Sequence, residues 1–218
     1  MYKKAFDGFG IQASIILNFP ADKKVYVIGP KGIEDELRGV GISFTGGTDP
    51  DDRVFVPSGD YSSIKNDPSI GAVLCGGDHF INYKKYAKAH TCIMNNPGCE
   101  FIITNGDESY PVAGGTLPAV SAPIRVSTNR TPTIIGKPSP HMMNCILADH
   151  DLDPERTIMV GDNLDTDILF GINSNIATLL VMTGVATESQ LTGGQKSVIV
   201  PDYIVQSMGD FAVLADER

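Results

Sequence analysis

The chain has 218 residues, a net charge of −9, 42% hydrophobic residues and 20% charged residues. This length allows one domain or two small ones, and the composition is that of a globular protein. The acidic balance argues against a nucleic-acid partner and suits an enzyme that acts on a small molecule. Neither an apolar run of about 18 residues nor a signal-peptide pattern is present. We therefore expect a cytoplasmic protein with no membrane partner.

The cysteines and histidines show no metal-ligand spacing. The cysteines are Cys75, Cys92, Cys99 and Cys145, and the histidines are His79, His90, His141 and His150. We expect reduced thiols, because disulfides are rare in the cytoplasm. For each histidine we expect an ordinary packing or surface role.

The first half of the chain alternates between short apolar strands and helical segments. The strands expected here are Lys24–Ile28, Gly71–Cys75 and Glu100–Thr104, and the helices are Gly32–Val40 and Asn82–Asn95. The segment Thr45–Pro68 is rich in Gly, Pro, Asp and Ser, which predicts a loop. This β-α-β-α-β alternation predicts a small parallel α/β unit with its own core.

A polar turn, Thr104–Pro111, follows the third of these strands. It contains Asn105, Asp107 and Tyr110, whose side chains suit contacts with a small polar ligand. The turn chemistry alone also explains these residue types, because Asn and Asp side chains bond their own backbone in Asx-turns. Both interpretations stay open at the level of the sequence.

The second half of the chain predicts a doubly wound parallel sheet, which is an α/β fold. The strands expected here are Thr133–Ile135, Ile158–Val160, Ala177–Met182 and Asp202–Val205, the last at the sheet edge, with a helix over Pro140–Asp149. The first two should be neighbours in the sheet, and the run Thr157–Val160 is apolar enough to be buried on both faces.

A cluster of carboxylates follows the strand at Ile158–Val160. Gly161 ends this strand, Asp162 stands at its carboxyl end, and Asp165 and Asp167 precede the apolar run Ile168–Phe170. Ligands of α/β sheets bind beyond the carboxyl ends of the strands, and carboxylates there suit a hard divalent cation. The alternative is a plain strand-to-helix turn in which Asp162 or Asp165 caps the helix.

Lys137 occupies the corresponding position after the strand Thr133–Ile135. Pro138 stops that strand and Pro140 suits a first helical turn, so Lys137 should lie at a strand end as Asp162 does. We predict that the two side chains approach each other across one crevice. An ammonium group beside a bound cation is typical of a phosphoryl-transfer site.

These two motifs carry a resemblance to a known family. Gly136-Lys-Pro-Ser-Pro140, followed by Val160-Gly-Asp-Asn-Leu-Asp-Thr-Asp167, resembles the third and fourth motifs of the haloacid-dehalogenase-type (HAD) phosphatases. More narrowly, it resembles the para-nitrophenylphosphatase and phosphoglycolate phosphatase branch, whose members carry a large α/β cap. The resemblance runs from about Lys23 to the C-terminus and includes Cys75-Gly-Gly-Asp78.

The resemblance implies a Mg²⁺-dependent phosphatase of small phosphorylated metabolites that forms an aspartyl-phosphate intermediate. Lys137 would neutralise the phosphoryl group, Asp162 would bind Mg²⁺, and Asp167 would support the metal site or Lys137. The role of Asp165 stays undecided. The Thr-Asn-x-Asp turn faces the active site in this family, which makes Asn105, Asp107 and Tyr110 the candidate substrate-binding residues.

The resemblance also divides the chain. Residues 1–21 would be a residual N-terminal core helix and a shortened linker. Residues 22–130 would be the cap, through which the family forms homodimers. Residues 131–218 would be the C-terminal part of an incomplete HAD-like core.

One family motif is missing from the sequence. Family members begin with a strand that ends in Asp-x-Asp-Gly, whose first Asp is the nucleophile, but this chain contains no such motif. Asp7-Gly8 does not replace it, because no strand precedes it and no second Asp lies two positions before the Gly. We therefore expect an N-terminally truncated chain with impaired activity. The rival interpretation is a non-catalytic truncated product that acts only as a dimerising module through its cap.

Overall fold

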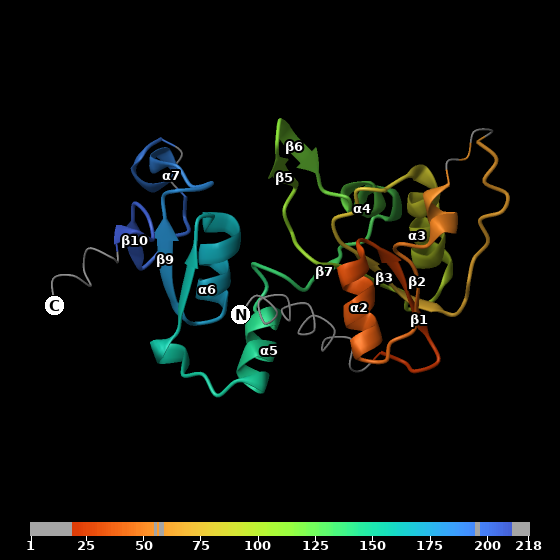
Figure 1. The fold of residues 1–218 in the computed structure, drawn as a ribbon, viewed down its shortest axis with the longest axis horizontal. Coiled ribbons are helices and arrows are strands. Elements are labelled where there is room, and N and C mark those ends of the chain that lie inside the picture. The colour runs from red at the N-terminus through yellow and green to blue at the C-terminus, as the bar shows by residue number, and fades with distance from the viewer. Residues whose placement is uncertain (1–18, 55, 57–58, 195–196, 211–218) are drawn as a thin grey trace. The chain divides into compact units, whose positions relative to one another are not determined.

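A computed structural model of the chain describes residues 19–54, 56, 59–194 and 197–210, apart from the side chains of residues 110, 111, 145, 148 and 149. The chain folds into two compact units, residues 1–135 and residues 136–218 (Figure 1). Of the predicted N-terminal helix and linker, residues 1–18 lie outside the described part. No helix within that part is long and apolar enough to cross a membrane.

The first unit is built on a parallel five-stranded sheet with the order β2-β1-β3-β4-β7. Its strands are β1 (Lys24–Ile28), β2 (Phe44–Gly46), β3 (Ile70–Cys75), β4 (Glu100–Ile103) and β7 (Thr133–Ile134). Its helices are α2 (Lys31–Gly39), η2 (Pro50–Arg53), α3 (Tyr83–Asn95) and α4 (Ala122–Thr128). The predicted strands and helices before residue 105 are confirmed to within about two residues at their ends.

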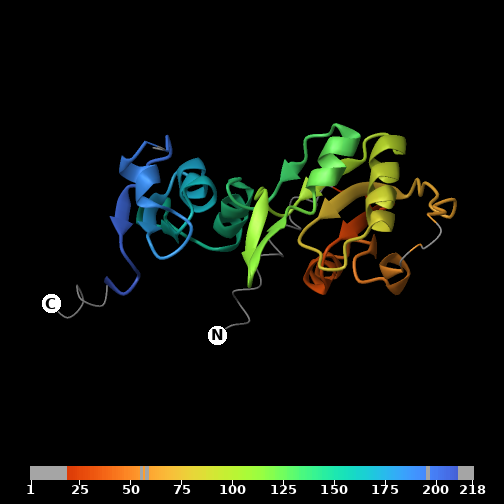
Figure 2. The same ribbon diagram turned by 90° about the horizontal axis from the view of Figure 1, so that it is seen from above.

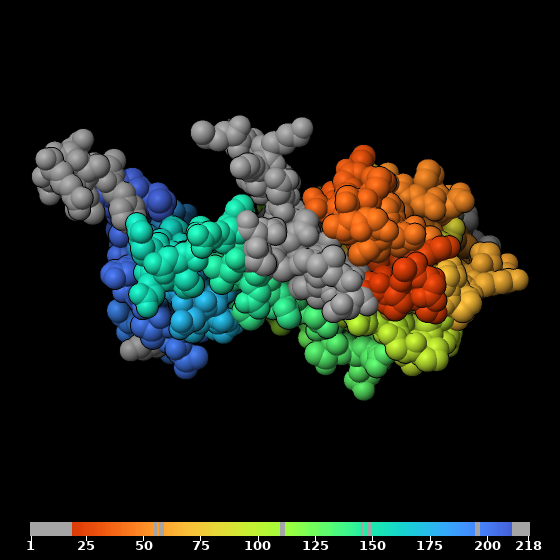
Figure 3. All heavy atoms as spheres, turned by 90° about the horizontal axis from the view of Figure 1, so that it is seen from below, coloured from red at the N-terminus to blue at the C-terminus, as the bar shows by residue number. Residues whose placement is uncertain are grey.

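Two hydrophobic clusters cover the two faces of this sheet, because successive side chains of a strand point to opposite faces. Val25 and Val27 of β1 pack with Ile33 of α2 on one face. Tyr26 and Ile28 pack with residues of α3 and α4 on the other. Figure 2 shows α3 and α4 side by side. In Figure 3 the red and orange segments from β1 to η2 gather on one side of the unit, with α3 and α4 on the other.

Several short elements of the first unit were not predicted, namely β2, η2, α4 and a hairpin. The expected loop Thr45–Pro68 begins inside β2 and contains the 3-10 helix η2. An antiparallel hairpin, β5 (Ser109–Val112) and β6 (Gly115–Pro118), follows the polar turn, with Tyr110 opposite Leu117. Gly114 and Gly115 at its tip both have positive φ angles, which suits a tight reversal.

The second unit is built on a parallel three-stranded sheet with the order β10-β9-β8. Its strands are β8 (Ile158–Gly161), β9 (Ala177–Val181) and β10 (Tyr203–Val205). Its helices are α5 (His141–Asp149), η3 (Pro154–Arg156), the π-helical turn η4 (Leu164–Ile168), α6 (Leu169–Asn173) and α7 (Glu188–Thr192). Leu164 and Ile168 of η4 pack against Leu180 of β9 in one cluster, while Phe170 of α6 packs with Met143 of α5 in another.

The prediction for Thr133–Ile135 was wrong in one respect. This segment is a strand, β7, but it pairs with β4 of the first unit and is not a neighbour of β8. The boundary between the units accordingly lies after Ile135, and not after residue 130 as expected. An apolar strand pattern shows that a segment is buried in a sheet, but it does not show in which sheet.

The strand β8 also differs from its prediction. Within the described part of the chain it pairs with β9 on one side only. Ile158 is consequently 44% exposed, and Met159, Val160 and Gly161 are half-buried. The expected burial on both faces is therefore wrong for this strand, whereas the prediction that Asp202–Val205 forms an edge strand is confirmed by β10.

Candidate active site

The Asp167 carboxylate organises the polar cluster at the carboxyl end of β8. Its Oδ1 accepts a hydrogen bond from Lys137 Nζ at 2.5 Å. Its Oδ2 accepts from the backbone N–H groups of Asp162 and Asn163, at 3.1 and 3.2 Å. Lys137 and Asp162 therefore lie on either side of one carboxylate, whose side chain is only 6% exposed.

The local sequence places Asp167 at this position. The Asn163 side chain caps the turn η4 by accepting a hydrogen bond from the Asp165 N–H at 2.9 Å. Buried Leu164 and Ile168 hold the turn against the core, so Asp167 points back toward β8. Gly161 permits this approach, because a Cβ atom there would lie 2.2 Å from the Cβ of Asp167.

Lys137 reaches this carboxylate from the turn that opens the second unit. The turn contains a cis peptide bond between Lys137 and Pro138, and Asn173 of α6 donates a hydrogen bond to the Pro138 carbonyl at 2.8 Å. The Lys137 side chain is 41% exposed, so its ammonium group is accessible from solvent. Asp167 orients Lys137 while leaving N–H donors of the ammonium for another acceptor.

The Asp162 carboxylate is held by a turn that follows β9. Its Oδ2 accepts a hydrogen bond from the Val185 N–H at 2.9 Å, and the Asp162 carbonyl accepts from the Ala186 N–H at 2.8 Å. Gly184 must be a glycine in this arrangement, since an added Cβ atom would lie 1.6 Å from Asp162 Oδ2.

Lys137 and the backbone of Asp162 therefore contact the same carboxylate, although β7 and β8 are not sheet neighbours, because η4 turns Asp167 back between them. The expected approach of the Lys137 and Asp162 side chains to each other stays a prediction. Asp165 differs from both, since it lies on the exposed side of η4. Of the two roles expected for Asp167, the contact with Lys137 is present in the structure, and the role toward a metal ion stays a prediction.

The donor chemistry at this site suits a hard cation, but the set of ligands is small. Mg²⁺ takes oxygen ligands and keeps several waters, so it needs few carboxylates from the protein. The described residues contain no group of three or more His, Cys, Asp or Glu side chains that could hold a metal ion. Asp162 fits as a single carboxylate ligand, and the described residues form at most part of a metal site.

A second candidate region lies in the first unit, at the carboxyl ends of β1, β3 and β4. A cavity of about 240 Å³ is lined there by side chains and backbone that include Pro30, Gly76, His79, Asn105 and Asp107. Ligand sites of parallel α/β sheets occur at this end of the strands. His79, for which the sequence suggested an ordinary role, thus stands beside two of the three candidate substrate-binding residues.

The cavity wall after β4 contains a short polar network. Thr104 Oγ1 donates a hydrogen bond to Asn105 Oδ1 at 3.3 Å, and Asn105 Nδ2 donates to Asp107 Oδ2 at 2.9 Å. Both bonds join side chains, whereas an Asx-turn bonds a side chain to the backbone, and they leave Asn105 and Asp107 on the cavity wall. The Tyr110 side chain lies outside the described residues, although its backbone belongs to β5.

Comparisons with known proteins agree with these features. A family model described as HAD-hydrolase-like matches residues 134–211. A 4-nitrophenylphosphatase from Schizosaccharomyces pombe is 45% identical over 204 residues, which cover 92% of this chain and 68% of that protein. Phosphoglycolate phosphatase 2 from Arabidopsis thaliana is 42% identical over 209 residues, which cover 91% of this chain and 67% of that protein. The chain belongs to the HAD-type phosphatase family.

Solved structures of HAD-type phosphatases share the fold. A single-mutant thermostable NPPase from Geobacillus stearothermophilus gives a TM-score of 0.73 at 31% identity, covering 93% of this chain and 71% of that one. A p-nitrophenyl phosphatase from Archaeoglobus fulgidus gives a TM-score of 0.72 at 26% identity, covering 95% of this chain and 72% of that one. The resemblance inferred from the two motifs and the α/β fold class are both confirmed.

Proposed function

We propose that this HAD-type chain carries the phosphate-binding and metal-binding part of a phosphatase site for small phosphomonoesters. The substrates we expect resemble para-nitrophenyl phosphate and 2-phosphoglycolate. The observation that carries this proposal is the contact of the Lys137 ammonium and the Asp162 backbone N–H with the two oxygens of the Asp167 carboxylate. The family membership supports the same chemistry.

Lys137 would bind an oxygen of the phosphoryl group through its accessible ammonium. Asp167 would hold that ammonium in place, because their hydrogen bond fixes a side chain that would otherwise sample many rotamers. A fixed positive charge stabilises the negative charge of a phosphoryl group more than a mobile one. The Asp162 carboxylate would provide a ligand for Mg²⁺, which neutralises phosphoryl oxygens when it is bound.

The cavity of the first unit is lined by residues that we propose bind the substrate. Asn105 and Asp107 present polar groups on its wall, and His79 adds a group that both donates and accepts hydrogen bonds. Tyr110 is the third substrate-binding residue that we propose from the family resemblance. A cavity of about 240 Å³ suits a small metabolite rather than a polymer.

We further propose that this chain by itself turns over phosphate esters poorly. Its sequence lacks the Asp-x-Asp-Gly motif that supplies the family's nucleophile. Loss of a nucleophile costs about 10⁴-fold or more in rate. The half-site would then bind a phosphate ester and Mg²⁺ without efficient chemistry, and we propose that it does so in the cytoplasm.

The test measures turnover of para-nitrophenyl phosphate and 2-phosphoglycolate with Mg²⁺, beside 2-phosphoglycolate binding by calorimetry. The chain is compared with a version extended by an N-terminal strand that ends in Asp-x-Asp-Gly. We expect binding but little turnover by the chain, and turnover by the extended version. Lys137→Met should weaken binding, and Asp162→Asn should abolish the turnover of the extended version.

Asp165→Asn is the matched control, because Asp165 lies in the same turn but is exposed. It should leave binding and turnover unchanged. Robust turnover by the original chain that vanishes in Asp162→Asn would show that another residue supplies the nucleophile. No binding by the chain and no turnover by the extended version would favour the rival, non-catalytic function.

We also propose that the first unit forms a homodimer contact. Tyr83 at the start of α3 is 68% exposed and Val126 of α4 is 84% exposed. Tyr83 and Pro123 also line a groove of about 310 Å³ between these helices. Light scattering at micromolar concentration should show a dimer for the chain and a monomer for Val126→Glu. Val198→Glu is the control, because Val198 is 95% exposed but lies in the second unit.

A further inference from the structure

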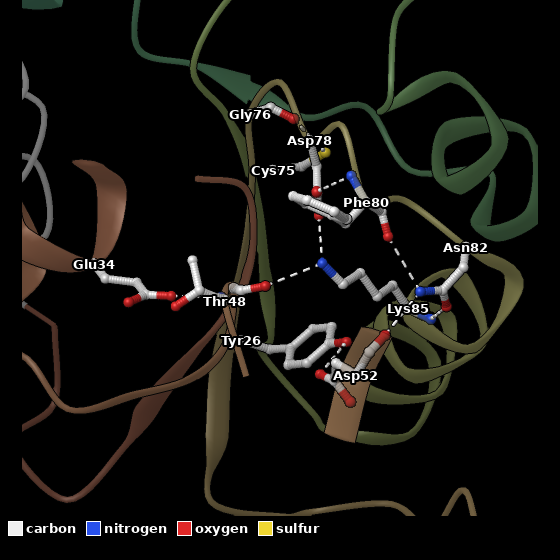
Figure 4. Close-up of polar contacts among 11 residues, drawn as sticks. Tyr26, Glu34, Thr48, Asp52, Cys75, Gly76, Asp78, Phe80, Asn82 and Lys85 are labelled. Atoms are coloured by element: carbon white, nitrogen blue, oxygen red, sulfur yellow. Dashed lines mark hydrogen bonds and ion pairs between the residues drawn. The ribbon is translucent and has the colours of Figure 1, made fainter. Parts of the chain in front are cut away.

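A buried ion pair lies beside the cavity of the first unit. Lys85 of α3 donates hydrogen bonds from Nζ to Asp78 Oδ2 at 2.6 Å and to the Gly47 carbonyl at 3.0 Å. The Lys85 side chain is 0% exposed and that of Asp78 is 3% exposed. Figure 4 shows Lys85 reaching from α3 to Asp78 on one side and to the backbone beside Thr48 on the other. Fully buried lysines are rare in folded proteins.

Stability alone does not explain such a pair. Burying two charges removes them from water, and well-packed apolar residues of similar volume often give an equally stable protein. A buried ion pair instead fixes the geometry of the groups that it joins. The question is therefore which part of the first unit depends on the orientation of the Asp78 carboxylate.

The orientation of the Asp78 carboxylate determines the backbone conformation of the next residues. Asp78 Oδ1 accepts a hydrogen bond from the Phe80 N–H at 2.8 Å, and the Asp78 carbonyl accepts from the Ile81 N–H at 3.3 Å. These bonds close an Asx-turn around His79. Lys85 therefore orients the carboxylate whose other oxygen fixes the backbone of His79.

The segment that is held in this way forms one wall of the cavity. Gly76, Gly77 and His79 line it, whereas Asp78 between them is buried and points to Lys85. The Gly76 N–H donates to the Ile28 carbonyl at 2.8 Å, which ties the start of the segment to β1. Lys85 and Asp78 tie its end.

The other partner of Lys85 is itself held firmly. Glu34 of α2, which is buried, accepts a hydrogen bond from the Thr48 N–H at 2.5 Å. Gly47 packs against the same carboxylate, so its carbonyl is fixed where Lys85 needs an acceptor. The lysine thus connects the cavity wall to α2 and to the loop after β2, which are remote from the wall in sequence.

We propose that Lys85 is a positioning residue that, through Asp78, holds residues 76–79 as a rigid wall of the cavity. A rigid wall sets the shape to which a ligand must conform, so the pair determines which organic groups this cavity accepts. The influence of Lys85 on ligand preference rests on the proposed function. Its influence on the rigidity of the wall is independent of that function.

Two double variants separate positioning from stability. Lys85→Met/Asp78→Leu removes both charges and the turn acceptor. Lys85→Met/Asp78→Asn also removes both charges, but the Asn oxygen can still accept from the Phe80 N–H. The Leu variant should be at least as stable as the Asn variant, because it leaves no buried polar side chain without a partner at residue 78. A looser wall is nevertheless expected only in the Leu variant.

The labelling rate of the Cys75 thiol measures the rigidity of the cavity wall when no ligand is present. It lines the cavity, is 2% exposed, and immediately precedes the wall. Burial raises the pKa of its thiol to about 12, so it should react slowly with iodoacetamide in the native protein. Cys92 and Cys99 are buried in the same hydrophobic cluster as Cys75 but do not line the cavity, so they serve as internal controls.

The experiment compares iodoacetamide labelling of the three thiols in the native chain and both double variants by peptide mass spectrometry. In Lys85→Met/Asp78→Leu, we expect Cys75 to label about tenfold faster, with Cys92 and Cys99 changed less than about twofold. In Lys85→Met/Asp78→Asn, Cys75 should label at nearly the native rate. Equal acceleration of all three thiols, or equal Cys75 rates in the two variants, would overturn the proposal.

A second readout addresses ligand preference. With 2-phosphoglycolate as the probe, binding should be about tenfold weaker in the Leu variant than in the Asn variant. Equal binding in the two variants would overturn the link to ligand preference. If the native chain does not bind this probe while Cys75 labelling follows the expected order, the proposed function fails and the positioning role of Lys85 stands.

Discussion

Lys137 Nζ lies 2.5 Å from Asp167 Oδ1, and this contact joins the turn that opens the second unit to the turn that follows β8. The partners are 30 residues apart in the chain. Because the Asp167 side chain is 6% exposed and that of Lys137 is 41% exposed, the carboxylate is the fixed partner and the ammonium is the one that it positions.

Asp167→Asn should weaken the hydrogen bonds of this site, although the amide has nearly the same size as the carboxylate. The amide keeps one oxygen acceptor but brings an NH₂ group toward either Lys137 or the N–H groups of Asp162 and Asn163. We expect the free energy of unfolding of the second unit to fall by about 2 kcal/mol, which is typical for the loss of a hydrogen bond to a charged group. Hydrogen exchange of the β8 and β9 amides measures the stability of the second unit alone.

Asp165→Asn controls for the loss of one negative charge from the same turn, because Asp165 is exposed. It should leave the exchange of β8 and β9 at its native rate. Similar acceleration by both substitutions would show that the Lys137–Asp167 contact contributes nothing specific to the fold of this unit.

Gly184→Ala should displace the Asp162 carboxylate rather than unfold the protein. The new Cβ atom would lie 1.6 Å from Asp162 Oδ2, and that oxygen ends a side chain that can rotate away. The hydrogen bond from the Val185 N–H would then be lost. We expect Mg²⁺ binding, measured by calorimetry with 2-phosphoglycolate present, to weaken about tenfold, since a misplaced ligand supports a metal poorly.

Gly32→Ala is the control, because a Cβ atom at this helical position meets nothing within 4 Å. It should bind Mg²⁺ as the native chain does. A native Mg²⁺ affinity in Gly184→Ala would contradict the assignment of Asp162 as a metal ligand.

Gly47→Ala should destabilise the first unit more than Gly41→Ala. Both glycines have positive φ angles, +61° and +75°, so both substitutions introduce the same kind of backbone strain. The Cβ atom at residue 47 would also lie 2.4 Å from Glu34 Oε1, whereas nothing lies within 4 Å at residue 41.

The strain alone should cost about 1 kcal/mol. The contact with Glu34 should add about 1–2 kcal/mol, since this carboxylate would have to leave the Thr48 N–H. Hydrogen exchange of β1 and β3 measures both losses. Equal losses at the two positions would show that Glu34 moves aside freely.

The sequence was sufficient for much of the fold because the relevant patterns are local. The apolar runs predicted the strands of both sheets except β2, and Gly161 marked the end of β8. The placement of β7 was mistaken because the choice between two sheets depends on long-range packing. The hairpin β5–β6 was missed because its strands are short and contain Pro111 and Pro118, residues that normally argue against a strand.

The candidate site was predictable in its residue types but not in its contacts. The spacing of Asp162, Asp165 and Asp167 indicated carboxylates at a strand end, but the π-helical turn η4 decides which of them point inward. The contact between Gly184 and Asp162 spans more than 20 residues, so no local pattern indicates it. The buried pair of Lys85 and Asp78 gave no signal, because a lysine in a helix is normally exposed.

Asp202 should make the stability of the second unit depend on pH. Its Oδ2 accepts hydrogen bonds from the Thr178 hydroxyl and the Thr178 N–H, both at 2.8 Å, across β9 and the start of β10. The bond from the Thr178 hydroxyl, followed by that from its N–H, lowers the pKa of Asp202 below its ordinary value. An unfolded aspartate has a pKa of about 3.9.

A carboxyl group with a lower pKa in the folded state stabilises the fold where it is ionised in both states. The contribution of Asp202 is therefore complete above the unfolded pKa and is lost as the pH falls through the folded pKa. Asp202→Asn should lower the melting temperature at neutral pH, and the difference from the native chain should shrink on acidification below about pH 4. Scanning calorimetry between neutral pH and about pH 3 follows this difference.

Asp151→Asn is the matched control, because Asp151 is exposed in the loop before η3. It should change the melting temperature little at any pH in this range. A constant difference between Asp202→Asn and the native chain across the range would show that the ionisation of Asp202 does not contribute. Its two hydrogen bonds would then stabilise the strand pair equally well when the carboxyl group is protonated.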